Sequence, residues 1–162
     1  MNVNSNAYTY TFATVMVVLV AVLLAGASLG LKSKQENNVK QEKMQSILAS
    51  VGVKVDRSEA QAAYDEVIKE VLTIKGGEVV STDREIGFNV DMAGAIKAEN
   101  MDREVPMYVA NKGGENYYII PLRGKGLWGP VWGFVSLESD GNTVVGANFG
   151  HKSETPGLGA EI

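Results

Sequence analysis

The sequence has no cysteine, a single histidine and only four prolines in 162 residues. Without cysteine the chain can form no disulfide, and it offers neither a thiolate nucleophile nor a cysteine ligand for zinc or an iron–sulfur cluster. The histidine, His151, has no companion at metal-ligand spacing, so we expect it to cap a turn or lie at the surface. The sequence therefore predicts no metal site and no catalytic residues.

Basic residues are too few for a nucleic-acid partner. The chain has 15 Lys and Arg against 19 Asp and Glu, which gives a formal net charge of −4 and a pI near 5.1. Binding to nucleic acid needs a basic surface that neutralises phosphates, and the sequence contains no basic stripe of this kind. We therefore exclude nucleic acid as a partner.

Charged residues are missing altogether from the N-terminal part, because every Lys, Arg, Asp and Glu lies from Lys32 onward. Residues 12–31 form an apolar run that, at about 1.5 Å per residue, gives a helix of about 30 Å, which matches the hydrocarbon core of a bilayer. A cleaved signal peptide is the alternative, since Ala25–Ala27 resembles a cleavage site. However, no basic residue precedes Phe12 and the apolar run continues past Ala27. These features favour a retained single transmembrane helix, with the lipid bilayer as a partner.

The change in composition divides the chain into four expected parts. They are an N-terminal segment over residues 1–11, the transmembrane helix over 12–31, a juxtamembrane helix with a linker over 32–57, and a domain over 58–162. Length and composition allow one modest globular core in the last part.

Two helices are predicted between the membrane segment and residue 77. Apolar residues at helical spacing between Met44 and Val51 indicate one buried face of the juxtamembrane helix. Ser58–Gln61 has the form of a capping box, and an apolar stripe from Tyr64 to Leu72 follows it. Gly76-Gly77 is a helix stop signal, so we expect the second helix to end there.

The pattern after Gly77 changes to short runs typical of strands, separated by turn signals. Because helices come first and strands later, the sequence predicts an α+β fold with a mainly antiparallel sheet. The last two strands are expected to form a hairpin. The predicted strands are Glu78–Thr82, Ile86–Asp91, Val105–Ala110, Tyr117–Leu122, Val131–Glu138 and Thr143–Phe149.

Gly124–Gly129 matches the G-x-G-x-x-G spacing of dinucleotide-binding folds, but its context does not fit. That motif must open a helix, whereas here Pro130 and the strand-like Val131–Glu138 follow, and the acidic residue expected about 20 positions later is missing. We reject a dinucleotide site. The glycines instead indicate a loop that needs positive φ or a close backbone approach. Such a loop beside Trp128 and Trp132 would suit a flat ligand, with core packing of either tryptophan as the alternative.

Three stretches of the sequence together resemble one family, the C subunits of the sodium-translocating NADH:quinone oxidoreductases. Residues 4–10 and the apolar helix after them resemble the start of that family, and Tyr118–Phe134 resembles its glycine-rich flavin-domain signature. His151–Gly159 contains its E-T-P-G-L-G flavin-site motif. The N-terminal match favours the sodium pump over the related Rnf electron-transport complex. The Rnf subunit stays an alternative, as does a membrane-tethered, non-redox binding or scaffold protein.

The resemblance implies FMN as the cofactor, held by the two glycine-containing segments. Leu127, Trp128 and Leu158 would cover the ring, Thr155 and neighbouring amides would donate hydrogen bonds, and Lys125 would pair with the phosphate or the reduced flavin. The ordinary alternatives are core packing for Leu158, turn chemistry for Thr155 and a solvated charge for Lys125. The predicted cofactor-binding residues are Lys125, Leu127, Trp128, Glu154, Thr155, Gly157, Leu158 and Gly159.

Family members attach FMN through a phosphoester bond to a threonine in an S-G-A-T or similar motif. This sequence contains no such motif, and Thr155 in E-T-P-G does not fit it. We therefore expect no covalent attachment within this chain. We also expect the chain to be truncated within its flavin domain, by about one hundred residues relative to a complete domain of this kind.

The function that the resemblance implies is electron relay between redox centres of neighbouring membrane subunits, during respiration-coupled export of Na⁺ by a complex that uses NADH and ubiquinone. The chain would be a subunit of that translocase without independent catalytic activity. The family places its flavin domain on the periplasmic side of the bacterial inner membrane. The lysines after the helix would favour the cytoplasm by the positive-inside rule, but we follow the family, because that rule is weak for first helices with few N-terminal charges.

Overall fold

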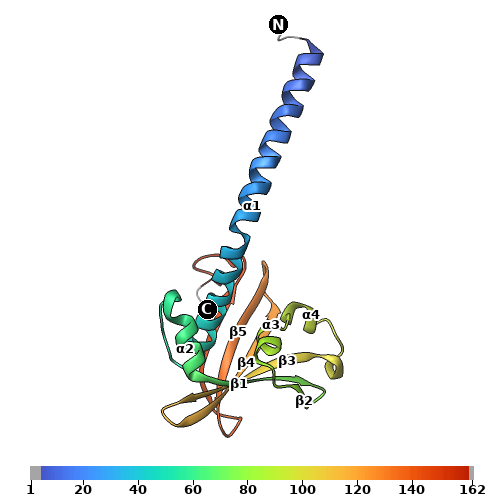
Figure 1. Cartoon of the computed structure of the whole chain (residues 1–162). Coiled ribbons are helices and arrows are strands. Elements are labelled where there is room, and N and C mark those ends of the chain that lie inside the picture. Colours follow the sequence, from blue (N-terminus) through green and yellow to red (C-terminus); the bar gives the residue numbers. More distant parts are fainter. Residues whose placement is uncertain (1–4, 161–162) are drawn as a thin grey trace. The chain divides into compact units, whose positions relative to one another are not determined.

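The computed structural model describes residues 5–160, and its contacts divide the chain into two units, Met1–Lys40 and Gln41–Ile162. Helix α1 runs from Asn6 to Ser50 without a break, as Figure 1 shows. In the described part of the chain it is the only helix long and apolar enough to cross a membrane, and none of its apolar window is buried. The sequence predicts a separate juxtamembrane helix, but no helix breaker follows Leu31, and a Lys32–Glu36 pair supports the continuing helix.

The second unit contains a six-stranded sheet in the order β2-β1-β3-β4-β5-β6, and every neighbouring pair is antiparallel. Short helices connect β2 to β3, and a helical segment precedes β1. The strands are β1 (Ile68–Lys75), β2 (Glu78–Ser81), β3 (Glu104–Lys112), β4 (Glu115–Lys125), β5 (Pro130–Glu138) and β6 (Val144–His151). The short helices are η1 (Arg57–Glu59), α2 (Ala60–Val67), α3 (Arg84–Asn89), α4 (Met92–Ala95) and η2 (Asn100–Asp102).

Five of the six predicted strands are confirmed, and the hairpin of the last two is confirmed by the β5–β6 pairing. Tight turns join the hairpins. Gly113 and Gly114 between β3 and β4 both have positive φ, which a two-residue hairpin turn of this hand requires. Between β5 and β6, Asp140 accepts hydrogen bonds from Thr143 and Asn142, and these bonds lower the pKa of its carboxyl group.

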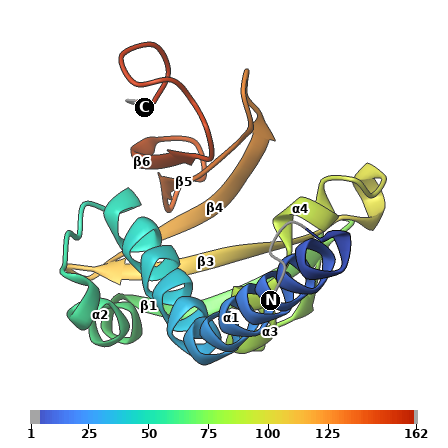
Figure 2. The ribbon, with the colours of Figure 1, turned by 90° about the horizontal axis from the view of Figure 1, so that it is seen from above.

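One face of the sheet carries the core, and the end of α1 packs on it together with α2 and α3 (Figure 2). The apolar face predicted between Met44 and Val51 is confirmed: Met44, Ile47, Leu48 and Val51 are all buried. Tyr108, Ile119 and Phe134 meet them from β3, β4 and β5. The sequence predicts the domain to begin at residue 58. The compact unit of the structure begins at Gln41, because this face of α1 is part of the core.

The second predicted helix is wrong beyond Val67. Residues 68–75 form strand β1, which pairs with both β2 and β3, and Gly76-Gly77 is the turn of the β1–β2 hairpin. Both glycines have positive φ, as such a turn requires. Nor does the capping box form, since neither η1 nor α2 has a side-chain cap. The run from Ile68 is rich in β-branched residues, and pairing on both edges outweighs its helical spacing.

The predicted strand at Ile86–Asp91 is also wrong, because Arg84–Asn89 is helix α3. The Asp83 carboxylate accepts hydrogen bonds from the backbone amides of Glu85 and Ile86, which is a strong signal for a helix start. A Cβ added at Gly87 would lie 2.5 Å from a Val71 methyl carbon, so the glycine lets α3 pack closely on β1.

Lys43 is a partly buried cation on the side of α1 that faces α3. Its Nζ donates a hydrogen bond to the backbone oxygen of Phe88 and lies 4.5 Å from the centre of the Phe88 ring. Burial lowers the pKa of the Lys43 ammonium group from 10.5 to about 8. The Lys43 ammonium group therefore loses its proton at a lower pH in the folded chain than in the unfolded chain.

We expect the Lys43→Met variant to be more stable than the wild-type chain at pH 7, by about 1–2 kcal/mol in the free energy of unfolding. Below about pH 8 the lysine is charged in both states, and folding carries the cost of burying it. Between pH 8 and 10.5 the folded chain releases this proton while the unfolded chain keeps it, so stability rises with pH.

Urea unfolding in detergent at pH 7 and at about pH 9.5 measures this effect. The pH range stops there because tyrosines of the unfolded chain ionise near pH 10. Burial raises the pKa of Tyr64 and Tyr108 in the folded chain, so stability falls again with pH above that value. The matched control is Lys40→Met, which removes an exposed lysine from the same helix. An equal pH slope in the wild-type chain and in Lys43→Met would contradict the assignment.

Candidate functional site

The glycine-rich segment is the loop of the β4–β5 hairpin. Lys125, the last residue of β4, pairs with Pro130, the first of β5, and the amide of Gly126 donates to the oxygen of Gly129 at 2.8 Å. A strand follows the loop directly. The rejection of a dinucleotide-binding helix at this motif is therefore confirmed.

None of Gly124, Gly126 and Gly129 has positive φ, so the backbone conformation does not require glycine at these positions. The loop needs glycine where other groups approach it closely. A Cβ at Gly126 would collide with the Glu154 carboxylate and lie 2.9 Å from the backbone oxygen of Gly129. At Gly124, by contrast, a Cβ would meet nothing within 4 Å. The tight position of the motif is thus Gly126, where the C-terminal segment touches the loop.

The C-terminal segment forms a compact turn after β6. The backbone oxygen of Thr155 accepts from the amides of Leu158, Gly159 and Ala160 at 3.1, 3.1 and 3.3 Å. Gly157 has a φ of +77°, which the turn places in the left-handed region. The side chains of Thr155 and Leu158 stay exposed. The E-T-P-G-L-G segment therefore forms a turn closed by backbone hydrogen bonds.

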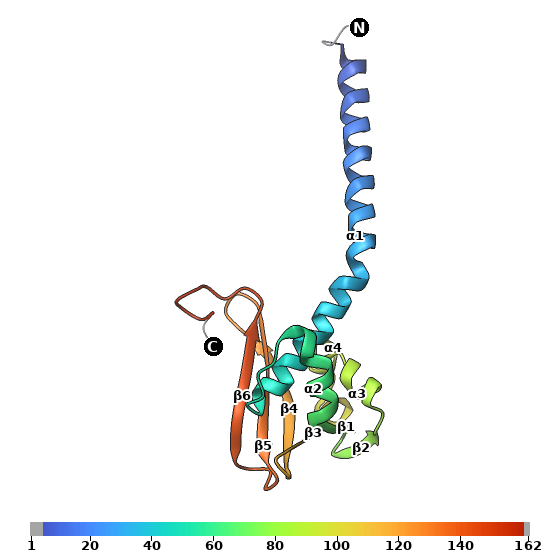
Figure 3. The ribbon, with the colours of Figure 1, turned by 60° about the vertical axis from the view of Figure 1, so that its left-hand side comes forward.

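The loop and the turn lie directly against each other. The amide of Trp128 donates to Glu154 Oε1 at 3.2 Å, and the amide of Lys152 donates to the oxygen of Pro130 at 3.2 Å. Figure 3 shows the β4–β5 loop and the C-terminal segment at the same end of the strands. Segments about 26 residues apart in sequence thus form one surface.

That surface displays three large apolar side chains. Leu127 is 82% exposed, Trp128 66% and Leu158 88%. Core packing of Trp128 and Leu158 is therefore excluded within the described residues, and all three side chains are available to a ligand or partner. Lys125 is also exposed, whereas Gly159 is half-buried, and a Cβ added there would lie 3.5 Å from Glu154 Oε2.

Sequence reasoning missed a hollow beside the loop. It has a volume of about 290 Å³ and lies next to the exposed apolar residues of the β4 and β5 ends. The Arg123 guanidinium lies 5.9 Å from the centre of the Trp132 ring, within range of a cation–π contact. Arg123 directly precedes the glycine motif, which is the signal that could have found it. The lining residues are Leu122, Arg123, Gly124, Val131, Trp132 and Phe149.

His151 connects the two ends of the turn. Its Nδ1 accepts from the amide of Glu154 at 3.2 Å, and its Nε2 lies 3.0 Å from the backbone oxygen of Ala160. The expectation that this histidine caps a turn is confirmed. Over residues 5–160, no three carboxylate or imidazole groups are close enough together to hold a metal ion.

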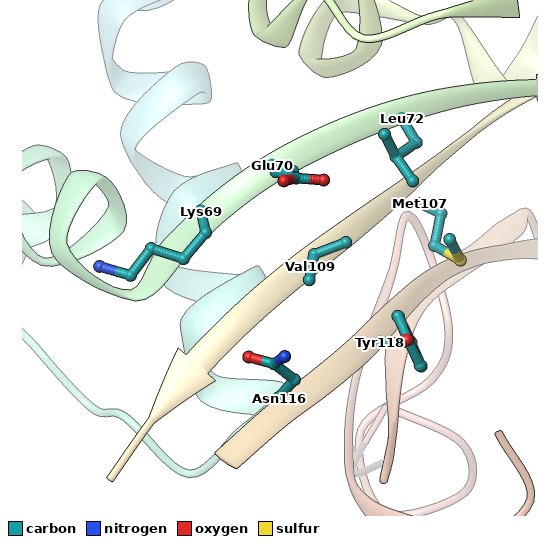
Figure 4. Close-up of a pocket in the computed structure, with 7 residues that line it drawn as sticks. All are labelled: Lys69, Glu70, Leu72, Met107, Val109, Asn116 and Tyr118. Carbon is teal, nitrogen blue, oxygen red and sulfur yellow. The ribbon is translucent and has the colours of Figure 1, made fainter. Parts of the chain in front are cut away.

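A second hollow lies on the sheet face opposite the core and near the other end of β4. Figure 4 shows its lining side chains standing on β1, β3 and the start of β4. From Tyr118 to Lys125 the strand rises by about 23 Å, so this hollow is remote from the loop. We do not include it in the candidate site. The lining residues are Lys69, Glu70, Leu72, Met107, Val109, Asn116 and Tyr118.

Comparison with known proteins finds a family match in the same region. Residues 126–162 match the family model of the FMN-binding domain. This range contains most of the β4–β5 loop and the whole C-terminal turn, which are the two segments in contact.

Most of the chain is similar to the C subunits of the Na(+)-translocating NADH-quinone reductases. It is 32% identical over 157 residues to the C subunit of Neisseria meningitidis serogroup B, an alignment that covers 86% of this chain and 60% of the relative. The identity to the Yersinia pestis homologue is 33% over 162 residues, with the same coverage of 86% and 60%. The chain thus spans about 60% of the length of these relatives.

Solved structures confirm the fold. The crystal structure of the C subunit from Parabacteroides distasonis has a TM-score of 0.73 and 45% sequence identity, covering 81% of this chain and 63% of that one. NqrC from Shewanella oneidensis has a TM-score of 0.58 at 22% identity, covers 73% and 62%, and supports the fold alone. The predicted α+β class, the predominantly antiparallel sheet and the family resemblance are confirmed.

Proposed function

We propose that this homologue of the C subunits of the Na(+)-translocating NADH-quinone reductases is a flavin-carrying, membrane-anchored subunit of such a complex. Within it the chain would relay electrons between redox centres of neighbouring subunits while the complex exports Na⁺. NADH oxidation and quinone reduction would belong to the complex, and the chain would have no catalytic activity alone. The similarity to these C subunits over 86% of this chain supports the assignment.

One observation carries the proposal: the glycine loop and the C-terminal turn meet and expose Leu127, Trp128 and Leu158 inside the range that matches the FMN-binding domain. A flat, apolar ring system needs such uncovered apolar side chains and a backbone free of bulky neighbours. The residues present therefore fit FMN.

The two segments divide the work of holding the cofactor. Leu127, Trp128 and Leu158 would cover the faces of the ring, and Thr155 and nearby amides would donate hydrogen bonds. The contact between loop and turn is filled by the Glu154 carboxylate, so the ring would lie against their exposed side. Glu154 then acts by holding the loop, whereas Gly157 and Gly159 shape the turn.

Bound FMN would supply the capacity to take up and pass on single electrons. The chain's own groups would tune that capacity by charge. Lys125 at the end of β4 and Arg123 in the neighbouring hollow are two cations beside the loop, and either can pair with the phosphate or with negative charge on the reduced ring. Covalent attachment through a threonine stays a prediction for the family, and we do not assign it to Thr155.

The placement of the chain completes the proposal. The apolar part of α1 would span the bacterial inner membrane, and the flavin domain would lie in the periplasm. The partners would be the lipid bilayer and the other membrane subunits of the complex. An orientation-dependent reporter fused after the domain tests this: one that works outside the cytoplasm should be active, and a silent but stable fusion would contradict the periplasmic placement.

Titration of FMN with the full chain in detergent tests the cofactor assignment. We expect saturable quenching of flavin fluorescence with one FMN per chain, because exposed tryptophan and leucine side chains would cover the ring. A folded chain, verified by its circular dichroism, that leaves FMN fluorescence unchanged would refute flavin binding by these residues.

We expect the Leu158→Ser variant to bind FMN about tenfold more weakly than the wild-type chain, because burying a leucine side chain contributes about 1.5–3 kcal/mol. Its stability should be unchanged, since this side chain is 88% exposed. The matched control is Val144→Ser, which removes another exposed apolar residue, 61% exposed, from the far end of β6. Equal FMN affinities of both variants would show that Leu158 does not contact the ring.

A further inference from the structure

His151 accepts and donates hydrogen bonds at opposite ends of the C-terminal turn. A backbone N–H can only donate, so Nδ1, at 3.2 Å from the Glu154 nitrogen, must be unprotonated. The ring proton then lies on Nε2, which donates to the Ala160 oxygen at 3.0 Å. The geometry thus requires the neutral imidazole with its proton on Nε2.

The histidine is also the first link of a chain that reaches the glycine loop. His151 fixes the Glu154 backbone, and the Glu154 carboxylate accepts from the amide of Trp128 at 3.2 Å. The same carboxylate occupies the space next to Gly126. A change at the His151 ring therefore reaches the loop through two hydrogen bonds.

We infer that His151, neutral and protonated on Nε2, is the positioning residue that holds the C-terminal turn against the glycine loop and keeps the flavin surface assembled. The flavin part of this inference rests on the proposed function, whereas the contact between turn and loop does not. His151 itself is not assigned any contact with the cofactor.

Protonation of the imidazole breaks this arrangement. In the cation both ring nitrogens carry protons, so Nδ1–H would face the amide N–H of Glu154, and two donors cannot bond. The surrounding charged groups are Lys152 and Glu154 on its own segment, and Arg123 and Lys125 on β4, two strands away. Acidification should therefore release the turn from the loop.

Nuclear magnetic resonance on the flavin-free, full chain in detergent tests the inference directly. The imidazole ¹⁵N shifts should report the proton on Nε2 at pH 7.5. Exchange protection factors of the Glu154 and Trp128 amides should fall roughly fivefold or more between pH 7.5 and 5.5, the range over which histidines take up a proton.

Three variants test whether His151 positions the turn against the loop or only contributes to the stability of the domain. His151→Ala should lower both protection factors at either pH. His151→Asn places a carbonyl oxygen near the position of Nδ1 that cannot be protonated, so protection of the Glu154 amide should no longer depend on pH. Ser153→Ala, at an exposed neighbouring residue, should behave as the wild-type chain.

FMN titrations of the same samples distinguish the two proposals. We expect the FMN affinity of the wild-type chain to fall at pH 5.5 about as far as amide protection does, and that of His151→Asn to stay constant. Unchanged protection in His151→Ala, or a proton on Nδ1, would overturn the positioning role even if FMN binds. Absence of FMN binding with the expected exchange pattern would overturn the flavin function and leave the positioning role intact.

Discussion

The Gly146→Ala variant is expected to lose about 3 kcal/mol in the free energy of unfolding of the sheet domain. A Cβ at Gly146 would lie 2.5 Å from the backbone oxygen of Ser50 at the end of α1, and backbone cannot move away as a side chain can. Ser136 Oγ donates to the same Ser50 oxygen, so the displacement would also break a buried hydrogen bond. Both costs fall on the point where α1 packs against β5 and β6.

Urea unfolding in detergent, followed by tryptophan fluorescence, measures this loss. The matched control is Val145→Ala, which truncates the exposed neighbouring residue of β6 and should cost well under half as much. A Gly146→Ala chain as stable as Val145→Ala would mean that the end of α1 does not pack on β6 as described. The FMN affinity of the folded fraction should be unchanged, because Gly146 is remote from the loop.

The expected loss of stability follows from the packing of the end of α1 on the core of the sheet domain. The last turns of α1 supply Ile47 and Leu48, both fully buried, to the core of the sheet domain. A domain cut at residue 58 would lose these side chains and expose Tyr108 and Phe134. The helix that carries the candidate membrane span is thus continuous with a structural element of the sheet domain.

The sequence predicted those parts of the fold in which local pattern and tertiary environment agree. The apolar residues from Met44 to Val51 recur at helical spacing, and the hairpin strands are bounded by clear turn residues. The run from Ile68 to Lys75 failed, because its apolar spacing fits a helix while its residues suit a strand. Only pairing with β3, distant in sequence, decides between the two.

The sequence predicted the parts of the candidate site that carry motifs, and it did not predict the contacts between side chains. The glycine loop and the C-terminal turn carry recognisable patterns, and their exposed leucines followed from the resemblance. The Arg123–Trp132 contact joins β4 to β5 through the sheet register, and the hydrogen bonds of His151 depend on how the segment after β6 turns back on itself. The register between two strands can be assigned only once it is known which strands pair, and a single sequence does not show this for strands such as β4 and β5.

The Gly126→Ala variant is expected to bind FMN at least about tenfold more weakly than the wild-type chain, while remaining folded. Its Cβ would displace the Glu154 carboxylate and press on the Gly129 oxygen at 2.9 Å and a Val131 methyl carbon at 3.0 Å. The amide of Trp128 would then lose its charged acceptor, and the loop would separate from the turn. The apolar side chains on the two segments would no longer form one surface.

Gly124→Ala is the matched control, because it adds the same methyl group to the same motif where nothing lies within 4 Å. Fluorescence titration with FMN, together with exchange protection of the Trp128 amide, separates the two variants. A loss of affinity in Gly126→Ala alone, accompanied by faster Trp128 exchange, would tie flavin binding to the contact between loop and turn. Equal losses in both variants would instead mean that the motif matters through backbone flexibility, and the assembled surface would not be the binding site.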